Sequence, residues 1–255
     1  MKRLSTPRIR VRDHRYLKTR LLRHEKRLSR RGYSLIAGVD EAGRGPLAGP
    51  VVASAVILKN YDFECQIDDS KKLTAKKREK AYDEIMEKAI VGVGIVDEKT
   101  IDEINIYHAA VKAMQMAISN LRIPPDYVIV DGRIKLPIEC PVRSIVRGDS
   151  QSMSIAAASI IAKVTRDRIM LEYDKIFPQY GFARHKGYPT KSHKEAIKKY
   201  GIIPIHRRSF KPVLDYLPDS PYRQARKTSK KHNQKFKNQL LRVGNRMLLS
   251  YLPDE

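Results

Sequence analysis

The 255-residue sequence lacks the features of a membrane, secreted or disulfide-bonded protein. Its two cysteines, Cys65 and Cys140, lie far apart and outside any CxxC or zinc-ligand spacing, so we expect ordinary reduced thiols. No apolar run approaches the roughly 18 residues that a membrane-spanning helix needs. The basic N-terminus is not followed by the apolar segment of a secretory signal. These absences favour the cytoplasm and predict no membrane partner.

The sequence is also poor in acidic residues. It has 51 Lys and Arg against 28 Asp and Glu, a formal net charge of +23. Residues 1–31 hold 13 basic and 2 acidic residues, and residues 222–249 hold 9 basic residues and no acid, whereas residues 32–221 are nearly balanced. Basic segments at both ends are typical of a protein that binds a polyanion. Solvated tails that only confer solubility have the same composition.

Length and charge together predict one domain with two appendages. We expect a basic N-terminal extension at 1–33, some of whose leucines recur at helical spacing. The domain itself, with C-terminal helices, is expected at 34–221. A basic C-terminal extension follows at 222–255, where the stretch 223–246 is predicted to be helical or disordered.

The apolar pattern within the domain predicts an α/β fold with one mixed β-sheet flanked by helices. Strands are expected at 35–39, 51–58, 90–96, 127–130 and 142–146. Helices are expected for about 15 residues after Thr74, and at 104–121, 150–177 and 190–200, with a loop at 180–190. The Ala-rich start of the helix at 150–177 suits close packing against a sheet.

Four acidic residues lie at the ends of these apolar elements. Asp40 and Glu41 end the first strand, Asp131 ends the strand YVIVD, and Asp149 lies between the last strand and the long helix. Each acid alone is typical of a turn or a helix cap. Sites in α/β proteins are built at the carboxyl edge of the sheet, so the shared location predicts that the four acids converge.

A cluster of acids in a basic protein has a chemical use. Neighbouring carboxylates repel one another and raise each other's pKa unless a cation neutralises them. Mg²⁺ and Mn²⁺ prefer oxygen ligands and often bind carboxylates together with substrate phosphates. Two such ions about 3.5–4 Å apart can stabilise both the attacking and the leaving oxygen of a phosphoryl displacement. The acids would then supply the chemistry, and the basic residues would hold the polyanion.

The segment EAGRGPLAGP between the first two strands is rich in glycine. It matches neither GxxxxGK[ST] nor GxGxxG and leads into a strand, so nucleotide or dinucleotide binding is poorly supported. Gly43 and Gly45 flank Arg44, and their lack of side chains would let main-chain amides approach a ligand closely.

Five segments, which follow one another in the same order along the chain, resemble the ribonuclease HII family across about residues 35–214. They are VDEAGRGPLAGPVVASAVIL, DSKKLT, VDG, GDSQSMSIAAASIIAKVTRD and HKGYPT. The resemblance implies a ribonuclease H-like fold. It also implies an endonuclease that cuts the RNA strand of RNA–DNA hybrids and cuts at ribonucleotides embedded in duplex DNA. The implied cofactors are two divalent ions, Mn²⁺ or Mg²⁺.

The resemblance also implies roles for individual residues. The family's metal-binding acids fall on Asp40, Glu41, Asp131 and Asp149. Its glycine turn, whose main chain contacts the ribose 2′-hydroxyl at the junction from RNA to DNA, falls on Gly43, Arg44 and Gly45. Arginine at position 44 favours type HII over the related type HIII. The junction-sensing tyrosine of the family falls on Tyr188.

Other matched positions are expected to bind phosphates or to support the fold. The positions implied to contact phosphates are Lys71, Lys72, His185 and Lys186. Asp167 also matches a family position, but it lies within the long helix beside Arg166 and Arg168. We therefore expect a structural ion pair there and leave Asp167 out of the site.

The expected reaction is metal-assisted hydrolysis of a phosphodiester that leaves 3′-hydroxyl and 5′-phosphate ends. Asp40 would bridge two ions, Glu41 and Asp131 would complete one ion site, and Asp149 the other. One alternative is a non-catalytic basic nucleic-acid-binding protein whose acids form turns. Another is a different two-metal enzyme, such as a DNA nuclease or a phosphatase. Nothing in the sequence requires an oligomer, so we expect a monomer. We also expect the basic ends to strengthen binding to the duplex.

Overall fold

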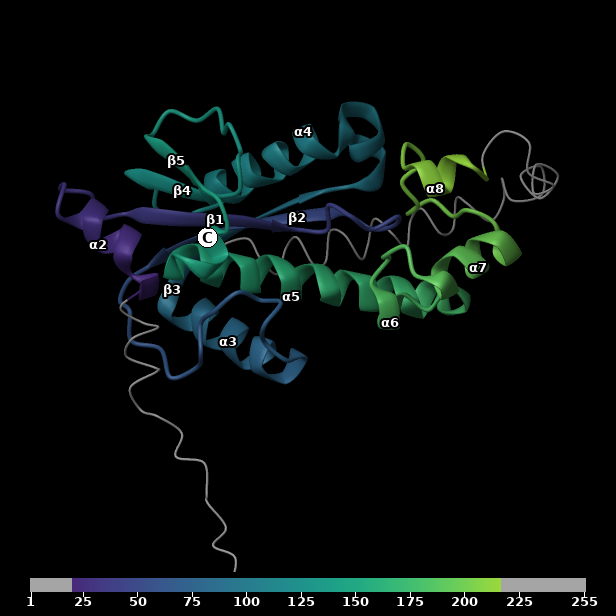
Figure 1. Cartoon of the computed structure of the whole chain (residues 1–255), viewed down its shortest axis with the longest axis horizontal. Helices are drawn as coiled ribbons and strands as arrows, with labels where there is room; N and C mark the ends of the chain where they lie inside the picture. The colour runs from purple at the N-terminus through teal and green to yellow at the C-terminus, as the bar shows by residue number, and fades with distance from the viewer. Residues whose placement is uncertain (1–19, 217–255) are drawn as a thin grey trace, which may run out of the picture.

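The computed structural model describes residues 20–216, which fold around a five-stranded mixed sheet (Figure 1). The strands are β1 (Ile36–Ala42), β2 (Val51–Leu58), β3 (Ala89–Val96), β4 (Tyr127–Asp131) and β5 (Val142–Ile145). They lie in the order β3-β2-β1-β4-β5. β2 is antiparallel to β1 and β3, whereas β1, β4 and β5 are parallel. The predicted α/β fold with a mixed sheet is confirmed.

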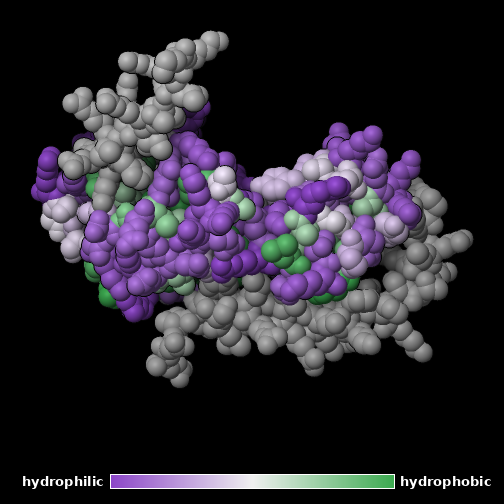
Figure 2. Space-filling model, turned by 90° about the horizontal axis from the view of Figure 1, so that it is seen from below, coloured by the Kyte–Doolittle hydropathy of each residue, from purple (hydrophilic) through white to green (hydrophobic). Residues whose placement is uncertain are grey.

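Helices cover both faces of the sheet (Figure 1). α4 (Glu98–Ser119) packs on one face, and α5 (Met153–Ile176) and α3 (Ala75–Lys88) lie on the other. The shorter helices are α2 (Arg23–Ser29), α6 (Phe182–His185), α7 (Lys191–Tyr200) and α8 (Lys211–Leu214). Seen from the side of α3 and α5, most of the surface is hydrophilic (Figure 2). Within residues 20–216, no helix combines the length and apolar character that a bilayer crossing requires.

Two helices begin elsewhere than the sequence predicts. α4 begins at Glu98, with Asp97 as its N-cap, and is broken at Asn105, where φ is 65°. The Asn105 side chain accepts hydrogen bonds from the amides of Tyr107 and His108, so the helix is capped a second time within its length. The predicted start at 104 therefore coincides with this break. Ser152 caps α5, so the helix begins after a 3₁₀ turn at Gly148–Ser150.

The central strand β1 and the helix α5 approach each other closely because both present small groups at their contact. Ala156, Ala157 and Ala158 at the start of α5 are fully buried. Opposite them, a Cβ atom on Gly38 would overlap the main chain of Ser154 and Ile155. The predicted close packing of the Ala-rich segment against the sheet is thus observed, and Gly38 is the residue in β1 that permits it.

Part of the predicted N-terminal extension packs against the domain. Leu21 and Leu22 join the core formed by the sheet, α3 and α5. The buried carboxylate of Glu25 accepts hydrogen bonds from the Ser154 amide at 3.0 Å and from the hydroxyls of Ser152 and Ser154 at 2.6 and 2.8 Å. Glu25 therefore caps the N-terminus of α5, where a negative charge is favourable. The rest of this extension and the predicted C-terminal extension at 222–255 lie outside the described residues.

We expect a Gly38→Ala substitution to lower the free energy of unfolding by at least about 2 kcal/mol, because the added methyl group would displace main-chain atoms of α5. Gly45→Ala is the matched control, since a Cβ there would meet only the Tyr188 ring at 3.8 Å. Urea unfolding of both variants measures the difference. Equal stability of the two variants would show that β1 and α5 do not need this close contact.

Candidate functional site

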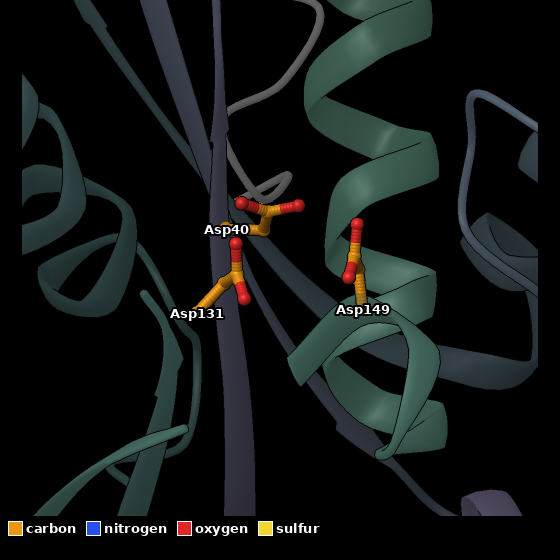
Figure 3. A group of neighbouring side chains, drawn as sticks. All are labelled: Asp40, Asp131 and Asp149. Carbon is orange, nitrogen blue, oxygen red and sulfur yellow. The ribbon is translucent and has the colours of Figure 1, made fainter. Parts of the chain in front are cut away.

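Three of the four predicted acids meet between the central strand β1 and the start of α5 (Figure 3). Asp40 lies in β1, Asp131 ends β4, and Asp149 lies in the 3₁₀ turn before α5. Val39 pairs with Val130 in the parallel β1–β4 ladder, so the next residues in each strand are neighbours. Each of the three acids offers a carboxylate oxygen, and these oxygens lie within 4.8 Å of one another.

Glu41 lies outside this group of three. Successive side chains of a strand point to opposite faces of the sheet, so the side chain of Glu41 leaves β1 on the other side from that of Asp40. Its Oε1 accepts a hydrogen bond from Nη1 of Arg44 at 3.2 Å. Burial raises the pKa of Glu41, and the Arg44 guanidinium opposes that rise.

The three clustered acids carry more negative charge than their neighbours neutralise. Burial, followed by the charges of Glu41 and Asp131, holds the pKa of Asp40 well above its usual range. The pKa of Asp149 is also raised, first by burial and then by Asp69 and Asp131. A divalent cation with a preference for oxygen ligands would relieve this repulsion. The donor set therefore fits Mn²⁺ or Mg²⁺.

Neutral groups near these carboxylates help to orient them, and none of these groups was predicted from the sequence. The Gly148 amide donates to Oδ1 of Asp131 at 2.6 Å. Ser159 on α5 lies near enough to Asp40 to lower the pKa of that carboxyl, and the Ser159 hydroxyl lies 2.9 Å from that of Ser70. Ser70 lies in the segment DSKKLT and Ser159 in AAASIIAK. Their place in these two segments was the one feature of the sequence that pointed to them.

Two buried arginines hold the glycine turn between β1 and β2 from the inside. Arg207 donates to main-chain carbonyls of the turn, namely those of Gly43, Arg44, Gly49 and Pro50, at 2.6 to 3.1 Å. Arg166 donates at 3.0 Å to the carbonyls of Ala48, Pro50 and Lys186. Burial raises the pKa of the nearby Glu98 to about 7, and the positive charges of Arg207 and Arg166 oppose that rise. Neither arginine was predicted to support the turn.

Tyr188 lies beside the glycine turn, as its predicted role requires. Its side chain remains 41% exposed, and its ring is the nearest group to a Cβ built on Gly45. The preceding residue, Gly187, accepts a hydrogen bond from the Leu47 amide at 2.8 Å. The guanidinium of Arg166 lies 5.9 Å from the centre of the Tyr188 ring. The turn and the tyrosine thus form one surface, although they are distant in the sequence.

The two lysines expected near phosphate have different surroundings. Lys71 is 80% exposed in its side chain, and its Nζ lies 3.7 Å from Oδ2 of Asp149. Lys72 pairs instead with Asp68 at 3.1 Å. Lys71 therefore lies beside the three acids, where it partly balances the charge of Asp149.

His185 and Lys186 are engaged within their own loop. The buried His185 ring has Nε2 2.8 Å from the Tyr180 carbonyl, and its Nδ1 accepts from the Gly187 amide at 3.2 Å. The ammonium of Lys186 donates to the carbonyl of Ala183. Both ring nitrogens of His185 therefore have main-chain partners, so this residue supports the loop in the conformation observed.

Asp167 forms the expected structural ion pair, but with a different partner. Its Oδ1 lies 2.6 Å from Nζ of Lys163, one helical turn earlier. Arg166 points into the glycine turn, and Arg168 pairs with Glu79 at 2.6 Å. Adjacent helical residues do not face each other, which explains why neither arginine pairs with Asp167.

A buried pair of histidines supports the main chain at Tyr188. The Ile203 amide donates to Nδ1 of His206 at 3.0 Å, so the proton of His206 is on Nε2. This Nε2 lies 3.1 Å from Nε2 of His193, whose Nδ1 lies 3.0 Å from the Tyr188 carbonyl. A carbonyl only accepts, so His193 carries its proton on Nδ1. Both rings are therefore neutral, and burial lowers the pKa of His193 to about 4 and that of His206 to about 3.

We expect the free energy of unfolding to fall as the pH drops below 6.5. In that range the histidines of the unfolded chain bind protons, whereas the buried rings stay neutral because their pKa values are lower. His206→Gln removes one such group. From pH 7 to pH 5, this variant should lose about 2 kcal/mol less stability than the wild type. Urea unfolding at both pH values measures this, with the exposed His108→Gln as control. Identical losses in all three proteins would contradict a neutral, buried His206.

The family and curated relatives match most of the chain. The ribonuclease HII family model matches residues 37–213. A ribonuclease HII of Acetivibrio thermocellus is 63% identical over 188 residues, which cover 73% of this chain and 73% of that protein. A ribonuclease HII of Geotalea daltonii is 53% identical over 203 residues, which cover 79% of this chain and 94% of that protein.

Solved structures share the fold. The ribonuclease H2 from Pyrococcus horikoshii OT3 matches with a TM-score of 0.62 at 30% identity, covering 71% of this chain and 96% of that one. A PCNA:RNase HII complex from Archaeoglobus fulgidus matches with a TM-score of 0.60 at 28% identity, covering 68% and 94%. Bst-RNase HIII in complex with Mn²⁺ has a TM-score of 0.57 at 17% identity and covers 74% and 71%, a likeness of fold alone.

Proposed function

Because the chain belongs to the ribonuclease HII family, and is thus a nuclease of the ribonuclease H type, we propose that it hydrolyses the RNA strand of RNA–DNA hybrids and also cuts at ribonucleotides embedded in duplex DNA. The observation that carries this proposal is the meeting of Asp40, Asp131 and Asp149 beside a surface formed by the glycine turn and Tyr188. The first group suits phosphodiester chemistry, and the second suits recognition of a sugar.

The acids would hold the divalent cations, Mn²⁺ or Mg²⁺. In this proposal the carboxylates of Asp40, Asp131 and Asp149, together with Glu41, would hold these ions. Bound ions supply Lewis-acid activation of the attacking water and stabilise charge on the leaving 3′-oxygen. To take part, Glu41 would have to release its Arg44 partner and turn its side chain toward the other three acids, so it is the acid that would move most. The products would carry 3′-hydroxyl and 5′-phosphate ends.

The Gly43–Gly45 turn and Tyr188 would select a ribose. DNA lacks the 2′-hydroxyl that distinguishes RNA. A site whose polar groups are arranged to bond this hydroxyl rejects a sugar without it, because those groups are then left unpaired. Tyr188, exposed next to Gly45, offers an aromatic face for the sugar or base at the junction.

The surrounding basic residues would hold the duplex. Lys71, Lys72 and Lys186 are proposed to contact phosphates, whereas His185 is proposed to act through the loop that carries Tyr188, because its ring nitrogens are already bonded. The positive charge of residues 1–31 and 222–249 would add affinity that weakens with salt. We propose that the protein works as a monomer in the cytoplasm.

The decisive assay compares three duplexes in the presence of Mn²⁺: an RNA–DNA hybrid, a DNA duplex with one ribonucleotide, and an all-DNA duplex. The wild type should cut the first two and leave the third intact. Asp131→Asn should lower cleavage by more than about 100-fold, since even indirect support of metal ligands is worth 10- to 100-fold, while binding largely survives.

Asp83→Asn is the matched control, because the Asp83 side chain is 75% exposed and lies outside the site; it should cut normally. Cleavage of all-DNA duplex at a similar rate would favour a general two-metal nuclease instead. Substantial activity in Asp131→Asn would remove Asp131 from the catalytic group.

Tyr188→Ala should reduce cleavage at a single embedded ribonucleotide by roughly tenfold or more, since stacking on an aromatic ring is worth about 1–3 kcal/mol. A long RNA–DNA hybrid offers many alternative registers and should be affected less. Tyr200→Ala, another exposed tyrosine at 46%, is the control. Initial rates on both substrates measure the difference, and equal losses on the two would exclude a junction-sensing role.

A further inference from the structure

The guanidinium of Arg207 is inserted beneath the glycine turn and is fully buried. Its Nη2 donates to the Gly43 carbonyl at 2.6 Å, and its Nη1 donates to the Arg44 carbonyl at 3.1 Å. Its remaining hydrogen bonds go to the carbonyls of Gly49 and Pro50 at the other end of the turn. One side chain therefore fixes the inward direction of two successive peptide groups.

This inward direction determines where the amides of the same peptides point. The described residues contain no cis peptide bond, and in a trans peptide the C=O of one residue and the N–H of the next point to opposite sides. With the Gly43 carbonyl on Arg207, the Arg44 N–H points away from the interior. The Arg44 carbonyl directs the Gly45 N–H outward in the same way. Within residues 20–216, neither amide has an acceptor among the hydrogen bonds of the chain.

The outward side of these peptides is the surface of the proposed ribose site. Arg44 and Gly45 are exposed, whereas Gly43 is buried. The Tyr188 ring lies 3.8 Å from a Cβ built on Gly45 and is the nearest group to it. Two successive main-chain N–H groups that point in the same direction form a concave donor pair, which suits an electronegative oxygen.

Arginine is the side chain that this arrangement requires. Its planar group carries five N–H donors on three nitrogens, whereas lysine carries three on one atom. The four carbonyls that Arg207 reaches are spread over both ends of the turn, so one ammonium group cannot satisfy them all. A glycine turn without this constraint can rotate its peptides at low cost.

We propose that Arg207 is the specificity-determining positioning residue of this site, which turns the amides of Arg44 and Gly45 toward the 2′-hydroxyl of the substrate ribose. The inference rests on the proposed function, because it assumes that the turn binds a ribose. Arg166 has a different role. It donates to the carbonyls of Ala48, Pro50 and Lys186 and so holds the turn against the Tyr188 loop. It does not bond the carbonyls of Gly43 and Arg44, which set the direction of the two amides.

The test measures binding to a duplex with one ribonucleotide and to the same duplex made of DNA, in full-length protein that carries Asp131→Asn so that neither is cut. Arg207→Lys should lower the preference for the ribonucleotide at least tenfold, through weaker binding of that duplex alone. Its affinity for all-DNA duplex should change less than about twofold. Arg208→Lys, its exposed neighbour, should retain the preference. Arg207→Lys with an unchanged preference would overturn the proposal.

A second measurement needs no Arg207 variant and can still overturn the proposal if Arg207→Lys does not fold. In isotope-labelled protein with the intact Arg207, the amide signals of Arg44 and Gly45 should shift with the ribonucleotide duplex and not with all-DNA duplex. Equal shifts with both duplexes would overturn the proposal. A starting protein with no preference for the ribonucleotide would instead refute the proposed function, so the two failures are distinguishable.

Discussion

Repulsion among three clustered carboxylates, two of them buried and one half-buried, is the constraint on which the rest of this structure depends. Asp40, Asp131 and Asp149 are held together by main chain that cannot easily separate them: the β1–β4 ladder and the turn that leads into α5. Burial and mutual charge raise the pKa of Asp40 and Asp149. The fold therefore maintains an arrangement that costs free energy until a cation neutralises it, as expected for residues kept for chemistry.

A second buried charge system, of opposite sign, lies under the glycine turn between β1 and β2. Arg166 and Arg207 place two guanidinium groups under the loop that joins β1 to β2, and the main-chain carbonyls of that loop satisfy them. The strand that carries Asp40 leads directly into the turn that Arg207 holds. Asp40 and the glycine turn are thus parts of one continuous segment, which in the proposed function would align the cut with a particular sugar.

The sequence predicts the acids that end apolar elements, but it does not predict which buried side chains contact the glycine turn. Asp40, Asp131 and Asp149 were predictable because each ends or follows an apolar element, and the edge of an α/β sheet brings such positions together. The position of Glu41 follows from strand alternation, yet its pairing with Arg44 depends on the shape of the turn. The buried contacts of Arg166 and Arg207 join segments far apart in the chain, and no local pattern in the sequence reveals them.

The central claim is that the three acids form a site for divalent cations, and a crystal structure grown with Mn²⁺ tests it most directly. Anomalous scattering identifies manganese without reference to any assumed ligand. The account predicts a strong anomalous peak bounded by the carboxylates of Asp40, Asp131 and Asp149, which disappears in Asp40→Asn. Manganese bound only elsewhere on the molecule, with these three side chains left as they are, would contradict it.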